Sequence, residues 1–424
     1  MTETVLTKSG DKFLINGKLV YSEINGSSSD AHGLLMNARL IQGIFDDANG
    51  RERYARFGFE CFDPDKNTDD LIAALPEWYK YGLRAFTVGF QGGGPCFTVN
   101  NSEINNNPFG TDGTTIDPAY LARMDKLIQG ADKAGMAVIV SYFYGAQAER
   151  ISDDLSIMRT VKTASNWLRD KGYKNVIIEI ANEHTVPPFL KHPILYTPDG
   201  VVTLMDIARR ESGGMMVGCS DVGGGLSEAI AKNSDIVLIH GNGQSRQQFY
   251  KLICDARKFN PTAPIVCNED SQAITNMAVS YKTGTSWGYY NNLTKQEPPA
   301  RWGVLEGEDK FFAYRMAMGI GIKVPELPES EQFYLAGLEE YMTTGGKRWI
   351  RLASLYPEKI DHVDFFRNGE YIYTGYCDPF TINYRSNWLQ GGTDNLPGEC
   401  TWEAKVLLTD GRKLELKKTV SDKK

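Results

Sequence analysis

Short apolar segments alternate with amphipathic segments over most of the chain. Several apolar segments, such as 137–140 and 236–239, contain only aliphatic residues, which is typical of strands buried on both faces of a parallel sheet. Strands that alternate with helices predict such a sheet with helices covering it. The segments predicted to be strands are 36–45, 85–90, 137–142, 176–180, 215–219, 236–239, 264–267 and 285–289.

The segments between the predicted strands have helical periodicity and helix boundary signals. Asp117 and Pro118 suit the start of one helix, and Gly135 suits its end. Eight strand–helix units in a segment of this length predict the α/β class and, within it, a (β/α)8 TIM barrel. The predicted helices are 68–80, 117–134, 155–169, 247–259 and 310–319.

Both ends of the chain depart from the strand–helix pattern. Before it, residues 13–21 predict a β-hairpin around an Asn-Gly turn. After it, the amphipathic stretch 326–341 predicts a last helix, and the short alternating strands downstream predict a small β-sandwich. We therefore expect a barrel with an N-terminal hairpin over residues 1–342 and a β-sandwich domain over 343–424.

Two of the predicted strands lead into glutamates. The strand 176–180 is followed by Asn182 and Glu183, and the strand 264–267 by Asn268 and Glu269. Catalytic groups of an α/β barrel lie at the C-terminal ends of its strands. Two carboxyls brought to about 5 Å there would suit the acid and the nucleophile of a retaining glycosidase.

In strand order, Glu183 ends the fourth predicted strand and Glu269 the seventh. This arrangement resembles the clan A glycoside hydrolases, of the family 5 type. The likeness rests on Ile-Glu-Ile-Ala-Asn-Glu at 178–183, on Cys-Asn-Glu at 267–269 and on Trp287 at the end of the eighth strand, and it covers about residues 34–325. The resemblance implies a retaining enzyme with Glu183 as acid/base and Glu269 as nucleophile.

The same resemblance implies roles for residues near the glutamates. Asn182 resembles the asparagine that hydrogen-bonds the sugar 2-hydroxyl, and His240, after the sixth predicted strand, resembles a residue that orients the nucleophile. A buried core histidine is the structural alternative for His240. Strict alternation would point Asn182 and Glu183 to opposite sides of a strand, so the motif requires a distorted strand end.

Aromatic and amide side chains at other strand ends complete the predicted substrate site. Trp287 offers a flat face for a sugar ring, with a buried core tryptophan as the alternative. Gln91 lies in a glycine-rich segment that lacks the lysine and the spacing of a phosphate loop, so we expect it to contact a hydroxyl. Tyr142 after the third strand and Asn242 after the sixth are the remaining substrate-binding candidates.

Two residues are predicted to support the site from inside the barrel. Glu179 lies four residues before Glu183, which is roughly 13 Å along a strand at about 3.3 Å per residue. Buried polar groups cost free energy unless they are paired. We therefore expect Glu179 to pair with an arginine such as Arg39 of the first strand.

The C-terminal domain resembles the immunoglobulin-like modules of bacterial polysaccharide-degrading enzymes. Residues 360–369 and 402–404 carry this likeness. The domain has two alternative roles: contact with a glycan through Trp388 or Tyr384, or bracing of the barrel. We favour bracing because the sequence shows no cluster of three exposed aromatic residues.

Composition limits the classes of partner and cofactor. The formal net charge is −7 and the only basic cluster lies near Lys417 and Lys418, which argues against nucleic acid. The chain has no run of about 18 apolar residues, so no membrane span is predicted. Seven cysteines without a C-x-x-C pair, and five histidines without H-x-H or H-E-x-x-H, predict no metal site. We expect no cofactor, and the sequence does not indicate an oligomeric state.

The N-terminus lacks a basic region followed by an apolar stretch, so the chain as given does not begin with a secretory leader. A mature periplasmic or extracellular bacterial protein would look the same, and a cytoplasmic location stays open as well.

Three other functions fit the sequence less well. A metal hydrolase needs several His and Asp ligands at strand ends, and a Schiff-base aldolase needs a strand-end lysine, which none of the predicted strands has. The main alternative is an inactive carbohydrate-binding barrel, against which the two glutamates argue. The sequence therefore predicts a retaining glycoside hydrolase acting on β-linked oligo- or polysaccharides, without indicating the sugar, the linkage, or exo or endo action.

Overall fold

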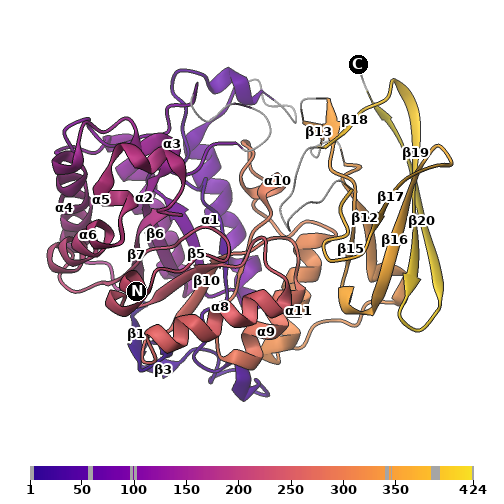
Figure 1. Ribbon diagram of the computed structural model, residues 1–424, viewed down its shortest axis with the longest axis horizontal. Helices are drawn as coiled ribbons and strands as arrows, with labels where there is room; N and C mark the ends of the chain where they lie inside the picture. The colour runs from indigo at the N-terminus through magenta and orange to yellow at the C-terminus, as the bar shows by residue number, and fades with distance from the viewer. Residues whose placement is uncertain are drawn as a thin grey trace.

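A computed structural model describes residues 4–55, 61–95, 99, 103–339, 343–344, 346–382 and 392–422. The chain forms an α/β part followed by antiparallel sheets, which lie side by side in Figure 1. No helix in these ranges is long and apolar enough to cross a membrane. Trp388 and Tyr384, the predicted glycan contacts, lie outside the described residues.

Parallel strands form the centre of the α/β part. In the described chain, six are hydrogen-bonded in the order β11-β4-β5-β6-β7-β8, and β10 pairs with β9. A parallel bridge between Val266 and Ser286 links β10 to the segment before β11. Each predicted strand is present, although several are shorter than expected. Their bounds are β4 (Asn37–Arg39), β5 (Ala85–Gly89), β6 (Ala137–Tyr144), β7 (Val176–Asn182), β8 (Met216–Gly218), β9 (Val237–His240), β10 (Ile265–Glu269) and β11 (Gly288–Tyr289).

The fold of this part is mixed α/β with a parallel sheet of six strands. No ladder joins β8 to β9 within the described ranges, so the strands do not form one continuously hydrogen-bonded barrel. The sheet residues are almost all buried, as the aliphatic strand sequences predict. A large hydrophobic core therefore extends on both faces of the strands, and a small separate cluster contains Phe45, Tyr54, Phe62 and Ile104.

Helices cover the strands and begin and end at the residues that the sequence marks. Asp117 caps α2 by accepting a hydrogen bond from the Ala119 backbone N–H, and Gly135 ends it with a φ of 77°. The five predicted helices all form. The helices are α1 (Pro64–Lys80), α2 (Pro118–Ala134), α3 (Gly145–Ala148), α4 (Asp154–Lys171), α5 (Pro193–Tyr196), α6 (Pro198–Glu211), α7 (Glu228–Asn233), α8 (Arg246–Phe259), α9 (Thr275–Thr283), α10 (Asn292–Lys295) and α11 (Glu308–Ile320). Short 3-10 turns are η1 (Ser29–Ala31), η2 (Arg51–Tyr54), η4 (Pro187–Lys191), η5 (Glu329–Glu331) and η7 (Pro357–Lys359).

The N-terminal segment forms a small antiparallel sheet of β1 (Leu6–Ser9), β2 (Lys12–Ile15) and β3 (Lys18–Leu19). Asn16 and Gly17 connect β2 to β3 with φ values of 52° and 77°, the left-handed conformations that an Asn-Gly hairpin turn requires. The predicted hairpin is confirmed.

The segment after α11 does not form the predicted last helix. Residues 329–331 make a 3-10 turn and Phe333–Ala336 form strand β12, which pairs antiparallel with β15. Leu335 and Leu338 are buried in a second hydrophobic core with the C-terminal strands, and this tertiary contact outweighs the helical pattern of the segment. The helix prediction for 326–341 is wrong, and the division of the chain at 342 and 343 stays a prediction.

The C-terminal strands form antiparallel sheets around the second core. The largest has the order β17-β16-β19-β20 in the described part of the chain. The bounds are β13 (Thr343–Thr344), β14 (Lys347–Arg348), β15 (Arg351–Ser354), β16 (Ile360–Arg367), β17 (Glu370–Gly375), β18 (Thr393–Asp394), β19 (Gly398–Leu408) and β20 (Lys413–Asp422).

Buried ion pairs join the two parts of the molecule. Arg351 of β15 pairs with Glu308 at the start of α11, and both side chains are almost inaccessible. The Nη2 of Arg351 lies 2.5 Å from Glu308 Oε2, which also accepts from Asn291 Nδ2 at 3.0 Å. The C-terminal sheets are thereby anchored to the connection that follows β11.

Candidate active site

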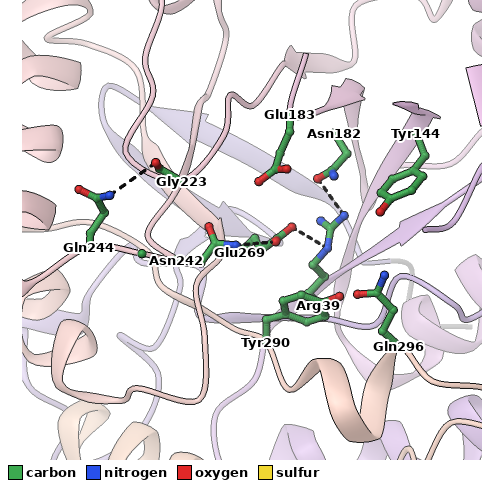
Figure 2. A pocket seen from close by; sticks show the side chains of 11 residues that line it. Arg39, Tyr144, Asn182, Glu183, Gly223, Asn242, Gln244, Glu269, Tyr290 and Gln296 are labelled. Carbon is green, nitrogen blue, oxygen red and sulfur yellow. Dashed lines mark hydrogen bonds and ion pairs between the residues drawn. The ribbon is translucent and has the colours of Figure 1, made fainter. Parts of the chain in front are cut away.

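A cavity of about 520 Å³ opens at the C-terminal ends of the parallel strands, the edge at which α/β barrels carry their catalytic groups. Figure 2 shows Glu183, Glu269 and Arg39 turned toward its centre. Its lining residues are Arg39, Tyr144, Asn182, Glu183, Gly223, Asn242, Gly243, Gln244, Glu269, Tyr290 and Gln296.

Glu183 follows the last residue of β7 and leaves the regular strand conformation. Its φ is 54°, in the left-handed region that non-glycine residues rarely adopt. Its backbone N–H donates to Ser220 Oγ at 3.1 Å, which holds this turn. The side chains of Asn182 and Glu183 consequently both line the cavity, so the expected distortion of the strand end is confirmed.

Glu269 ends β10 and is much more enclosed than Glu183. The pairing of β10 with β9 shifts register between Cys267 and Glu269. The Arg39 Nε lies 2.8 Å from Glu269 Oε2, and Asn242 Nδ2 donates to Oε1 at 2.8 Å. Burial raises the pKa of Glu269, while the charges of Arg39 and His240 oppose this rise.

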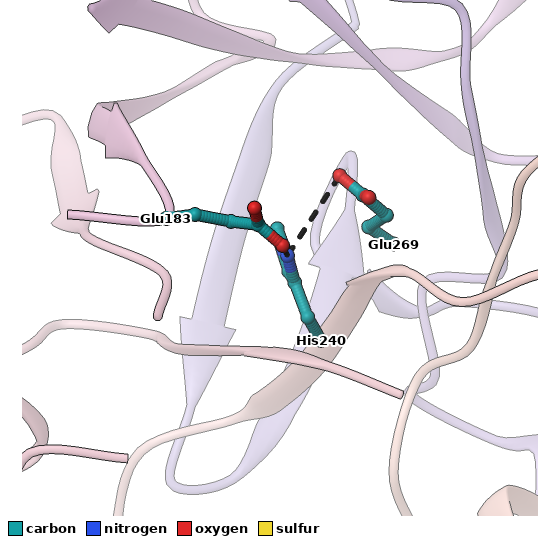
Figure 3. Close-up of side chains that lie close together, drawn as sticks. All are labelled: Glu183, His240 and Glu269. Atoms are coloured by element: carbon teal, nitrogen blue, oxygen red, sulfur yellow. Dashed lines mark hydrogen bonds and ion pairs between the residues drawn. The ribbon is translucent and has the colours of Figure 1, made fainter. Parts of the chain in front are cut away.

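His240, the last residue of β9, lies between the two carboxylates (Figure 3). Its Nδ1 is 3.0 Å from Glu183 Oε1 and 3.7 Å from Glu269 Oε2. Both neighbours are carboxylates, so this nitrogen can donate a hydrogen bond to them when it carries a proton. Burial by itself would lower the pKa of His240, but the charge of Glu269 and the hydrogen bond to Glu183 raise it.

Arg39 of β4 connects the two strand ends. Its Nη2 donates to Asn182 Oδ1 at 2.8 Å while its Nε faces Glu269. The guanidinium is buried, with the Tyr290 ring 5.7 Å away. Burial by itself would lower the pKa of Arg39. The negative charge of Glu269, together with the neighbouring acids, outweighs this effect, so the pKa of Arg39 is raised.

Glu179 is buried in the sheet, as expected, but its hydrogen-bonding partner is not Arg39. Asn268 Nδ2 donates to Glu179 Oε1 at 3.0 Å, and the ion pair of Arg39 is made with Glu269. The predicted pairing is therefore wrong. Glu269 lies at the end of β10, where the register shift aims it toward Arg39.

Trp287 does not line the cavity. It is fully buried, and its Nε1 donates to Asp270 Oδ2 at 2.7 Å. Its ring packs near Phe312 of α11, so the alternative of a core tryptophan describes it. Tyr290, three residues later, provides an aromatic ring at the cavity instead.

Gln91 and Tyr142 also lie behind the cavity wall. The Tyr142 hydroxyl bonds Ser165 Oγ at 3.0 Å within the core. Gln91 Oε1 accepts from the Tyr144 backbone N–H at 3.0 Å, and Tyr144 itself lines the cavity.

Tyr144, Tyr290, Gln244 and Gln296 line the cavity and are not among the residues selected above as substrate-binding candidates. Tyr144 is the last residue of β6 and lies beyond the predicted end of that strand, and strand alternation does not mark it, because Tyr142 has the same parity but faces Ser165 of α4. The other three belong to connections after β9 and β11, where no periodic pattern marks the inward-facing residues.

Glu183, His240 and Glu269 form the group that comes nearest to a metal site among the described residues. One donor atom from each lies within 4.8 Å of the other two. However, the Arg39 Nε is 2.8 Å from one oxygen of Glu269, and its positive charge would repel a cation bound there. Two carboxylates beside fixed positive charge suit proton transfer and nucleophilic attack better than cation binding.

No protein-family model and no curated protein matches the chain. It is similar to the structure of a putative glycoside hydrolase from Bacteroides vulgatus ATCC 8482, with 11% identity and a TM-score of 0.50, over 98% of this chain and 80% of that one. At this identity the similarity shows the fold alone.

Two further structures are less similar. A beta-glucuronidase from Parabacteroides merdae has 10% identity and a TM-score of 0.44, over 99% of this chain and 50% of that chain. An endo-1,4-beta-mannanase from Rhizomucor miehei has 11% identity and a TM-score of 0.43, over 68% of this chain and 90% of that chain. The chain thus spans about half the length of the beta-glucuronidases it matches.

Proposed function

We propose that the protein is a retaining glycoside hydrolase that cleaves β-linked O-glycosidic bonds by double displacement, with Glu269 as nucleophile and Glu183 as acid/base. The observation that carries the proposal is the closeness of the two carboxylates: one oxygen of Glu183 and one oxygen of Glu269 lie within 4.8 Å of each other. Retaining enzymes hold these groups about 5–5.5 Å apart, whereas inverting enzymes leave about 6.5–9.5 Å for a water.

The surroundings of the two carboxylates support different roles. Arg39 and His240 favour the ionised form of Glu269, which is the form that attacks the anomeric carbon. Glu183 is less enclosed, with 21% of its side chain exposed, so it can exchange a proton with the leaving group and then with water. The separation of roles rests on environment, because both residues are glutamates.

In the first step, a Glu269 oxygen forms a bond to the anomeric carbon as the bond to the leaving oxygen breaks. Glu183 donates its proton to that oxygen. In the second step, the Glu183 carboxylate takes a proton from water, the water oxygen bonds to the anomeric carbon, and the bond to Glu269 breaks. Both glutamates return to their starting states, and no cofactor enters the balance.

Polar groups around the cavity suit a sugar. Asn182 lies beside Glu183 and is oriented by Arg39, consistent with a contact to the 2-hydroxyl. Asn242 Oδ1 and Arg39 Nη1 are buried without a hydrogen-bond partner among the described residues. A substrate hydroxyl can donate to the Asn242 oxygen or accept from the Arg39 nitrogen, and removal of the hydroxyl would leave that atom unpaired.

We also propose that the α/β part is a (β/α)8 barrel. The strand order β4 to β11 and the bridge from β10 to the segment before β11 are the order that a (β/α)8 barrel requires. Glu183 and Glu269 would then end the fourth and seventh barrel strands, where the family resemblance expects the acid/base and the nucleophile. The C-terminal sheets would be the accessory β-sandwich.

Product stereochemistry tests the proposal directly. Aryl β-glycosides of glucose, mannose, xylose, galactose and glucuronic acid, together with β-linked polysaccharides, identify a hydrolysed substrate. Proton NMR of the first product formed should show the β anomer before mutarotation. An α anomer as first product would contradict the retaining mechanism. Binding of the sugars without hydrolysis would favour an inactive carbohydrate-binding protein.

A further inference from the structure

A second cavity of about 290 Å³ adjoins the first one. Gly243 and Gln244, in the connection between β9 and α8, line both cavities. The second cavity continues from them to the C-terminal sheets, where residues 357–360 and 376–380 form its far wall. The two cavities are therefore neighbours on one path that leads from the carboxylate pair to the accessory part of the molecule.

The wall that the C-terminal part contributes is held in place by hydrogen bonds and charge. Asp378 Oδ2 accepts from the Thr275 backbone N–H at the start of α9, at 3.1 Å. Glu358 pairs with Arg315 of α11 at 2.8 Å. These contacts tie both sides of the second cavity together, so it is formed by the folded chain without a partner.

The side chains of the second cavity combine an aromatic ring with mixed polar groups. Tyr376 is 74% exposed, the largest fraction among the exposed large hydrophobic residues described, and its ring lies 5.9 Å from that of His362. Arg246 contributes donors, and Glu358 and Asp378 contribute acceptors. An exposed ring beside donors and acceptors of both kinds suits a neutral sugar unit, which has an apolar C–H face and hydroxyls that both donate and accept.

We propose that the second cavity is a binding site for further sugar units of the chain that is cleaved at Glu183 and Glu269, so that the substrate is an extended β-linked oligo- or polysaccharide held partly by the C-terminal sheets. The proposal rests on the proposed function. It adds that Tyr376 stacks on a sugar unit distant from the cleaved bond and that the accessory part contributes to binding as well as to bracing.

The dependence of rate on chain length tests this site. The probes are β-1,4-linked gluco-, manno- and xylo-oligosaccharides and β-1,3-linked gluco-oligosaccharides of two to six units, with a short aryl glycoside as reference. The ratio of kcat/KM for the longest hydrolysed oligosaccharide to that for the aryl glycoside should fall about fivefold or more in Tyr376→Ala, as expected when a central aromatic contact is lost. The loss should appear in KM.

Three further variants separate loss of the sugar contact from folding effects. Tyr376→Phe keeps the ring and should retain most of the ratio. Tyr371→Ala removes another exposed tyrosine of the same sheet, 55% exposed and outside the cavity, and should leave the ratio unchanged. Arg246→Ala, at the opposite side of the cavity, should lower the ratio as Tyr376→Ala does, with a smaller effect.

The outcomes distinguish this proposal from the proposed function. If the aryl glycoside is hydrolysed but the ratio does not change in Tyr376→Ala and Arg246→Ala, the second cavity does not bind substrate while the hydrolase assignment stands. Hydrolysis of the aryl glycoside without any rate gain from two to six units would likewise overturn the extended site. If no glycoside is hydrolysed, the proposed function fails and this site fails with it.

Discussion

The two strand ends that carry Glu183 and Glu269 have the same residue pair, Asn-Glu, in different surroundings. Glu183 follows β7 in a left-handed conformation with 21% of its side chain exposed and His240 as its charged neighbour. Glu269 lies within β10, with 6% exposed, held by Arg39 and Asn242. The same dipeptide thus yields one accessible carboxyl and one that is desolvated and fixed.

This difference shows how a structure separates the tasks of two identical side chains. A nucleophile benefits from a fixed orientation and from positive charge nearby, because it must stay ionised and aim one oxygen. A proton carrier must reach both the leaving oxygen and water. Substitutions at Glu269, at Glu183 and at the residues around them should therefore lower activity by different amounts.

The largest effect is expected when the enclosed carboxylate is removed. Glu269→Gln keeps the shape and the contact with Arg39 but cannot form the glycosyl bond, so kcat on the substrate found by screening should fall by at least about 10⁴-fold. Glu23→Gln, at an exposed site, is the matched control and should have normal activity. Near-normal hydrolysis by Glu269→Gln would exclude it as nucleophile.

Removal of the accessible carboxylate should have a smaller effect that depends on the leaving group. Glu183→Ala should lose about 10²- to 10⁴-fold in rate on natural glycosides and less on aryl glycosides with an activated leaving group. Sodium azide should partly restore activity and give the β-glycosyl azide, identified by NMR. If the α-glycosyl azide formed instead, Glu269 would not be the residue that forms the covalent bond, and the roles of the two glutamates would be reversed.

Loss of the charge beside Glu269 should shift its pH dependence. Arg39 lowers the pKa of Glu269, so Arg39→Gln should move the acid limb of kcat/KM to higher pH and lower the neutral rate about 10- to 100-fold through misplacement of the carboxylate. Arg39→Lys keeps a charge and should shift the limb less. If the acid limb of kcat/KM lies at the same pH in the parent protein, Arg39→Gln and Arg39→Lys, the ionisation of Glu269 does not control that limb.

The smallest effect on activity is expected at Asp270, the neighbour of Glu269 on the opposite side of the strand. Burial raises its pKa from 3.8 to about 7. The folded state therefore holds this proton more tightly than the unfolded state, so its contribution to stability is complete below about pH 4 and is lost as pH rises through 7.

Urea unfolding of Asp270→Asn measures this contribution. A rise from 3.8 to about 7 corresponds to roughly 4 kcal/mol at most. The variant should lose less stability than the parent protein between pH 4 and pH 7, with hydrolysis little changed because Asp270 accepts from Trp287 and Asn276 rather than lining the cavity. Parallel stability curves would contradict the raised pKa.

Much of the α/β part was predictable from local pattern. Aliphatic runs marked several of the parallel strands, and Asp117, Pro118 and Gly135 marked the ends of α2. The segment 333–336 was not predictable in the same way, because its amphipathic spacing suits a helix but its partner β15 lies further along the chain. Pairing partners that are distant in sequence leave no local signal.

The sequence predicted the two carboxylates of the candidate site, but not which other residues line the cavity. A glutamate at the end of a buried strand is identifiable from sequence because strand ends are marked by the change from apolar to polar residues. Trp287 and Tyr290 show the limit: only one faces the cavity, and residues after a strand follow no fixed alternation.

The sequence by itself determined the order of the parallel strands and the two glutamates at strand ends. Only the tertiary structure decided that Arg39 pairs with Glu269 rather than Glu179, that His240 lies between the carboxylates, and that the C-terminal sheets close a second cavity. The physical reason is that periodicity reports which face of an element is buried, whereas register shifts, left-handed turns and packing between distant segments decide which side chains meet.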